Sequence, residues 1–305
     1  DVLKSQTDNI AKEDAYTLAL FAQDEIKLLR NLQALIGVRY IYHENFKNHA
    51  TPNVALMYKP GKFNFRASYA AGFRTPTLSE LYATDIPKKN DRLTIGNLDL
   101  KPEKNNYFSL SAEYVHERFS VSVNAFYNNI RDMIDYNTIA TGDKAMEQYG
   151  HKEVRQRDNI AEAKVHGINV SANAYLGAGF NLSGGYTHLN TQDVELEQPI
   201  DKSIKNAYNI NAQWAHSWKI YRLNINLNGR FNSKRFSKSY GYAPEYQLWD
   251  LNTRHSFNLK SVIIEPGCGM ENLFDYMDDR PYNSNYATLT PGRSFYISLS
   301  LKFKS

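Results

Sequence analysis

Apolar and polar residues alternate with a period of two in thirteen short stretches of this 305-residue chain. In the last stretch Phe295, Ile297 and Leu299 are apolar, whereas the neighbouring Ser298 and Ser300 are polar. Successive side chains of a β-strand point to opposite faces of a sheet, so this period predicts strands with one apolar and one polar face. The chain is therefore expected to be all-β, and its apolar face must contact something other than water.

The alternation and the turn residues between the stretches predict where each strand lies. The clearest strand has Leu223, Ile225 and Leu227 on one face and Asn224 and Asn226 on the other. The thirteen expected ranges are 13–27, 31–42, 48–58, 62–73, 104–116, 118–134, 159–176, 179–190, 205–216, 219–232, 245–260, 261–275 and 293–303.

Hydropathy excludes a helical membrane protein. The longest apolar runs are about five residues, such as 34–38, whereas a membrane-spanning helix needs roughly 18. The mean hydropathy of −0.57 would suit a water-soluble protein. A membrane β-barrel remains compatible with it, because each of its strands turns only half of its residues toward lipid.

The connections between the strands alternate in length. Six of them are short, near 28–31, 59–61, 116–118, 176–179, 216–219 and 259–261. Five are long, at 74–103, 136–158, 191–204, 233–244 and 276–292, and the connection at 43–47 is a brief exception. An up-and-down meander then has its tight turns at one end and its long loops at the other. This asymmetry is typical of outer-membrane barrels, with short periplasmic turns and long extracellular loops, and a soluble β-sandwich has no reason to show it.

The strand count predicts an incomplete barrel. Thirteen antiparallel strands leave the first and last strands running in the same direction, so these two could not pair to close the sheet. Residues 1–305 are therefore expected to be the C-terminal portion of a larger transmembrane barrel, beginning within an extracellular loop.

Other function classes find little support. The net charge of +4 is small and dispersed, so no nucleic-acid partner is expected. The sequence lacks the nucleophile-elbow, zinc-protease, paired-cysteine and phosphate-loop motifs, so neither catalysis nor a bound cofactor is expected. The eight histidines are scattered, and the lone Cys268 cannot form an internal disulfide.

Several motifs resemble those of the TonB-dependent outer-membrane receptors. They are residues 20–25 (LFAQDE), 37–40 (GVRY), 72–82 (GFRTPTLSELY), 96–104 (GNLDLKPEK), 271–275 (ENLFD) and 291–295 (PGRSF), and they span nearly the whole chain. The boxes around Arg74, Glu103 and Asp275 are interpreted as structural elements where strands meet loops.

This resemblance implies a 22-stranded barrel in the bacterial outer membrane, plugged by an N-terminal domain. Such a receptor would bind an iron compound, a ferric siderophore or haem, and import it with energy transmitted by TonB through an N-terminal segment outside this chain. A cobalamin receptor, a passive porin and a structural barrel are the alternatives. Outer-membrane lipid and a surface lipoprotein are the further partners that the resemblance implies.

Two loops carry residues suited to an anionic or catecholate chelate, since cations interleaved with aromatic rings attract such ligands. The candidate residues are Tyr82 and Arg92 in the loop 74–103, and Lys234, Arg235, Lys238, Tyr240 and Tyr242 in the loop 233–244. A solvated surface, or contact with lipopolysaccharide, explains the same residues and stays open. Haem receptors of the resembling family carry a His that residues 77–95 lack, which leaves Tyr82 as a substitute oxygen ligand.

Overall fold

Thirteen long strands form one antiparallel sheet in the order of the chain. The computed structural model describes residues 2–3, 13–85, 91–237, 241–278 and 291–304. The long strands are β3 (Thr17–Leu29), β4 (Leu32–His43), β5 (Lys47–Tyr58), β6 (Phe63–Arg74), β9 (Glu103–Val115), β10 (Phe119–Thr141), β11 (Glu153–Gly177), β12 (Phe180–Asp193), β13 (Asn206–Trp218), β14 (Tyr221–Asn232), β17 (Tyr246–Asn258), β18 (Val262–Glu271) and β19 (Ser294–Phe303).

Shorter elements lie in the connections. They are the strands β1 (Val2–Leu3), β2 (Glu13–Asp14), β7 (Thr84–Asp85), β8 (Arg92–Ile95), β15 (Arg235–Ser237) and β16 (Gly241–Ala243), and the helices α1 (Leu78–Tyr82) and α2 (Gly142–Tyr149). Among the residues that the structure describes, neither helix is long and apolar enough to cross a membrane.

The thirteen predicted strands are confirmed, with one substantial correction. The expected loop 136–158 is largely ordered, because β10 continues to Thr141 and β11 begins at Glu153. We call the sheet of long strands, without residues 133–158 of β10 and β11, the wall. Its alternation becomes irregular in β10 beyond Asp132, which has a φ of +55° that interrupts a regular strand. The sequence pattern therefore marks the end of the wall but misses the strands beyond it.

The register between neighbouring strands aligns their apolar residues, so that one face of the whole sheet is apolar. One row of directly paired residues runs from Val54 through Tyr69, Phe108 and Tyr127 to His166. Val54, Phe108 and Tyr127 are 44%, 49% and 37% exposed, which is unusual for large apolar side chains in water. A lipid-facing surface explains this exposure.

The opposite face is polar, and amides and hydroxyls bridge its strands. Asn211 Nδ2 donates to Asn226 Oδ1 and to Asn228 Oδ1, each at 2.6 Å. The hydroxyls of Ser122 and Ser171 lie 2.7 Å apart between β10 and β11. The expected division into an apolar and a polar face is thus confirmed.

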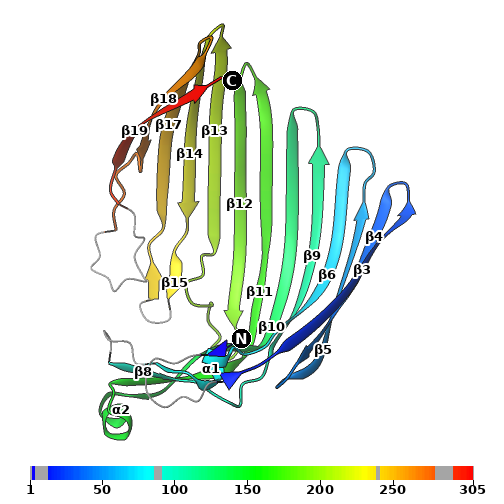
Figure 1. The fold of residues 1–305 in the computed structure, drawn as a ribbon, viewed down its shortest axis with the longest axis vertical. Coiled ribbons are helices and arrows are strands. Elements are labelled where there is room, and N and C mark those ends of the chain that lie inside the picture. The colour runs from blue at the N-terminus through cyan, green and yellow to red at the C-terminus, as the bar shows by residue number, and fades with distance from the viewer. Residues whose placement is uncertain (1, 4–12, 86–90, 238–240, 279–290, 305) are drawn as a thin grey trace.

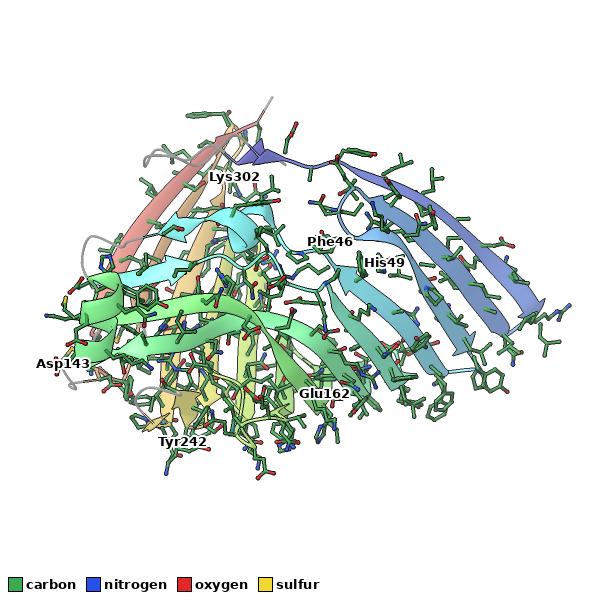
Figure 2. All side chains as sticks on the ribbon, turned by 90° about the horizontal axis from the view of Figure 1, so that it is seen from below. Phe46, His49, Asp143, Glu162, Tyr242 and Lys302 are labelled. Atoms are coloured by element: carbon green, nitrogen blue, oxygen red, sulfur yellow. The ribbon has the colours of Figure 1, made fainter. Side chains whose placement is uncertain are left out.

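The sheet is curved and open. β3 and β19 are its two edges and do not pair with each other. Figure 1 shows the tight turns that follow β3, β5, β9, β11, β13 and β17, and the C-terminus, at one end, which we call the turn end. The longer connections and the short turn between β4 and β5 lie at the other, the loop end. Viewed from the loop end, the strands follow an arc from β19 to β3, with α1 inside it (Figure 2).

Candidate ligand site at the loop end

The two longest strands leave the wall and build a separate layer. Beyond residue 132, β10 and β11 remain paired, and α2 joins them. β8 adds to this ribbon by parallel pairing of Arg92–Ile95 with residues 153–156. We call this layer, residues 92–95 and 133–158, the roof. It lies below the wall strands in Figure 1 and crosses the open end of the arc in Figure 2.

One face of the roof has its own apolar core. Leu93, Ala140, Ala145 and Val154 form a buried cluster, in which Ala145 of α2 and Val154 of β11 are completely inaccessible. α2 therefore covers this face of the ribbon. The helix ends at Tyr149 and is followed by Gly150, whose φ of +74° is the left-handed conformation that glycine adopts without strain.

The other face of the roof is charged, because alternate residues of a strand point to opposite sides. Arg92 Nε lies 2.9 Å from Glu153 Oε2, and Arg155 Nε donates to the other oxygen of the same carboxylate. Burial alone would raise the pKa of Glu153, but the hydrogen bonds from Arg155 and Arg92 outweigh it and lower that pKa. The carboxylate is thus held ionised between two guanidinium groups.

A third arginine lies on the same face. Arg157 is paired with Tyr136 across the ribbon, and its Cζ lies 3.7 Å from the centre of the Tyr136 ring. The guanidinium also donates to the phenolic oxygen of Tyr136. Among the described side chains of the roof, this face carries three cations and one carboxylate and is therefore net positive, so it can attract an anionic ligand that presents a flat aromatic surface.

A clasp fixes the roof to the wall. Asn159 Nδ2 donates to the Asp132 carbonyl at 2.6 Å and to the Lys101 carbonyl at 2.9 Å. The Lys101 amide returns a hydrogen bond to Asn159 Oδ1 at 2.7 Å. The bend at Asp132 and the re-entry of the chain at Lys101 are thereby joined through one side chain.

The boxes at 72–82 and 96–104 meet in an ion-pair network. Arg74 makes two hydrogen bonds to Glu103, and its Nη1 lies 3.0 Å from Glu80 Oε2. The hydrogen bond to Glu103 is the main cause of a raised Arg74 pKa. Burial would raise the pKa of Glu80, but hydrogen bonds from Thr77 and Arg74 lower it. The charged residues of these two motifs thus bind one another, as a structural role for the motifs requires.

The predicted residues of the loop 74–103 are engaged within the chain. Tyr82, at the end of α1, is half-buried beside a core of Leu81, Leu100 and Ile134. Arg92 is paired with Glu153 on the charged face of the roof. Through Glu153 the structure brings Arg92 close to Arg155. Arg155 was not predicted from the sequence, because residues 136–158 were expected to form a loop. The alternation of Glu153, Val154 and Arg155 was the available signal.

The predicted residues of the loop 233–244 lie on a separate hairpin. Arg235 is half-buried in β15, and Lys234 before it is exposed. Tyr242 of β16 is 57% exposed and packs edge-on against Phe236, with ring centres 5.3 Å apart. Figure 2 shows Tyr242 at the margin of the molecule, away from Phe46 and His49. Lys238 and Tyr240 lie outside the described residues.

Histidines at the loop end have partners of their own. His49 stacks on Phe73 with ring centres 3.7 Å apart, and its Nε2 lies 2.8 Å from the Phe46 carbonyl. His151 Nδ1 lies 3.0 Å from Asp91 Oδ1. Within the described part of the chain, no group of three or more His, Cys, Asp or Glu side chains is placed to hold a metal ion.

The fold and motifs agree with a known protein family. A family model described as "TonB dependent receptor-like, beta-barrel" matches residues 2–273. The chain belongs to this TonB-dependent receptor family. Its members are transport receptors, and their barrel fold implies the outer membrane of a Gram-negative bacterium.

Solved structures of TonB-dependent receptors share the fold. A mutant of the ferric enterobactin receptor of Pseudomonas aeruginosa matches with a TM-score of 0.78 and 20% identity, over 98% of this chain and 46% of that one. The siderophore receptor PirA of Acinetobacter baumannii matches with a TM-score of 0.75 and 17% identity, over 98% and 47%. The copper transporter OprC matches with 0.72 and 13%, over 94% and 48%. The chain thus spans about half the length of these proteins.

Proposed function

We propose that the chain is part of an outer-membrane receptor that binds a ferric siderophore at the cell surface and imports it with TonB-transmitted energy. The observation that carries this proposal is the charged face of the roof. There Arg92 and Arg155 share the single carboxylate of Glu153, and Arg157 lies over the ring of Tyr136. This face offers positive charge and an aromatic surface at the loop end.

An anionic ferric catecholate suits this face better than haem does. Guanidinium groups pair with oxyanions in two-point geometry, and they stack on aromatic rings. Haem iron instead needs an axial ligand, and His49 and His151 are already bonded within the chain. Haem, with Tyr82 as its oxygen ligand, is therefore the second candidate, and cobalamin the third.

We expect the rest of the receptor to lie outside this chain. Residues 1–305 would supply thirteen strands of a 22-stranded barrel, whose other strands and plug would come from sequence outside this chain. The asparagines of the polar face would hydrogen-bond the plug, and TonB would engage a segment N-terminal to it. A surface lipoprotein partner also stays a prediction.

Binding to the full-length receptor in detergent tests the ligand. Quenching of protein fluorescence by a ferric tris-catecholate should be saturable. The variant Arg155→Gln/Arg157→Gln should weaken binding by about tenfold or more, because charge-assisted hydrogen bonds are lost. The control Arg66→Gln/Arg222→Gln changes two exposed arginines near the turn end and should leave affinity unchanged.

A parallel haemin titration separates the candidates. Haemin should cause no saturable shift of the Soret band. A stoichiometric shift together with absent catecholate binding would overturn the siderophore assignment in favour of haem, and Tyr82→Phe would then be the first variant to examine.

A further inference from the structure

Cations are concentrated in the tight turns. The residues that connect strands at the turn end, with the one that follows β19, include seven cationic side chains and one carboxylate, Glu117. The seven are Arg30, Lys59, Lys62, Arg118, Lys219, Lys260 and Lys304. The formal charge of the whole chain is only +4, so the rest of the chain is net negative. We call these seven residues the cationic rim.

The cationic rim is available to a partner. All seven of its side chains are exposed. Among the residues that the structure describes, no ion pair involves any of them; Lys304 alone is tied down, with Nζ donating to the Leu259 carbonyl at 2.7 Å. Like charges gathered without counter-charges repel one another, so an anionic partner would relieve this repulsion.

An aromatic band lies directly beside the rim. Five of the seven cations adjoin an exposed aromatic residue in the sequence: Tyr58–Lys59, Lys62–Phe63, Arg118–Phe119, Trp218–Lys219 and Phe303–Lys304. These aromatic residues belong to the apolar face, where Trp218 also stacks on Tyr221 with ring centres 5.5 Å apart. Aromatic side chains of barrels sit at the level of the lipid head groups, so the adjacent cations reach the phosphates.

We infer that the cationic rim selects anionic phospholipids, such as phosphatidylglycerol, from the periplasmic leaflet around the barrel. Charge and position together favour this partner over an acidic protein, because the cations follow the circumference of the sheet next to its lipid-facing band. The turn between β11 and β12, Gly177–Phe180, carries no charged side chain, so the cationic rim is interrupted there and should not attract anionic lipid at this turn. The inference rests on the membrane orientation of the proposed function, with the turn end in the periplasm, and is independent of the imported ligand.

Lipid selectivity of the full-length receptor tests this inference. The receptor is reconstituted in phosphatidylcholine vesicles, and the relative association of spin-labelled phosphatidylglycerol and phosphatidylcholine is measured by electron spin resonance. Wild-type receptor should prefer phosphatidylglycerol by about twofold or more, since each cation near a lipid surface adds attraction. The variant Lys59→Gln/Lys62→Gln/Lys219→Gln/Lys260→Gln should lose most of this preference.

The matched control removes four exposed lysines from the loop end instead: Lys47→Gln/Lys144→Gln/Lys152→Gln/Lys202→Gln. It changes the net charge equally and should retain the preference. Salt provides a second measurement on unaltered receptor, because about 1 M NaCl screens exposed charges and should abolish the preference.

Equal association of the two lipids with wild-type receptor, or an unchanged preference in the rim variant, would overturn the inference. Rim-dependent binding to isolated peptidoglycan without lipid selectivity would also overturn it, and would assign the surface to an anionic wall polymer. Ferric chelate binding, measured on the same samples, should be the same in the rim variant as in wild-type receptor, so failure of the lipid inference and failure of the proposed function are distinguishable.

Discussion

Arg74, the last residue of β6, and Glu103, the first residue of β9, are joined by two parallel hydrogen bonds across the base of a 28-residue connection. Glu103 Oε1 also accepts the backbone amide of Ile134 at 2.8 Å, so one carboxylate links β6, β9 and β10. The same guanidinium reaches Glu80 of α1. The pair thus closes the connection at its base and holds α1 within the curve of the sheet.

Removing this link should loosen the connection without unfolding the wall. We expect Glu103→Gln to destabilise the packing of residues 77–85 by roughly 1–2 kcal/mol, because a two-point charged pair becomes a neutral contact. Limited proteolysis of the full-length receptor should then cut this segment faster. Glu162→Gln is the control, since its 3.8 Å pair with Lys164 is half-exposed and should contribute little. Equal cleavage of both variants would contradict the role of Glu103.

Acid should loosen the same connection. The folded pKa of Glu80 lies below its usual value of 4.5, so its stabilising effect is complete above about pH 4.5 and is lost as pH falls through the lower folded pKa. Hydrogen exchange of α1, corrected for intrinsic rates, should be constant between about pH 7 and 5 and rise below about pH 4. In Glu80→Gln the exchange should be high throughout. A wild-type profile that rises with increasing pH would contradict the assignment.

The apolar core of the roof should control the order of α2. Val154→Ala removes two buried methyl groups from a side chain with no accessible surface, and should destabilise the roof by roughly 2 kcal/mol. Hydrogen exchange in α2 should increase while exchange in β12 stays constant. Val123→Ala serves as the comparison, because Val123 is 41% exposed on the apolar face. Unchanged α2 exchange in Val154→Ala would show that the core does not support the helix.

Neighbouring positions of β9 should respond oppositely to charge. Leu110 is 63% exposed on the apolar face, whereas Ser111 lies on the polar face. Leu110→Arg should cost about 2–4 kcal/mol of folding free energy in bilayers, and Ser111→Arg much less. Urea-induced unfolding in liposomes measures both. A larger cost for Ser111→Arg would reverse the assignment of the lipid face.

The wall could be predicted from sequence because its rule is local. In β14, Leu223, Ile225 and Leu227 alternate with asparagines, and pairing with β13 and β17 only continues a pattern already visible in each strand. The parity of the connections likewise needs no tertiary information. Both features follow from the lipid on one side and the polar interior on the other.

The roof could not be predicted in this way. Its parallel pair of β8 and β11 joins Arg92 to Glu153, residues far apart in the sequence, and no local pattern specifies such a contact. Tyr82 shows the opposite case, a predicted ligand residue that packing makes less accessible. Its phenolic oxygen suited a ligand, but the packing of α1 half-buries its side chain beside Leu81. Partners brought together by tertiary structure decide which loop residues remain available to a ligand.

Energy-dependent uptake distinguishes an active receptor from a passive pore. Cells expressing the full-length receptor are supplied with a ferric tris-catecholate carrying radioactive iron, with and without an uncoupler of the proton-motive force. Uptake should be saturable and should stop when the membrane is de-energised or when TonB is absent. Uptake that rises linearly with concentration and persists under both conditions would contradict active transport and identify a passive pore.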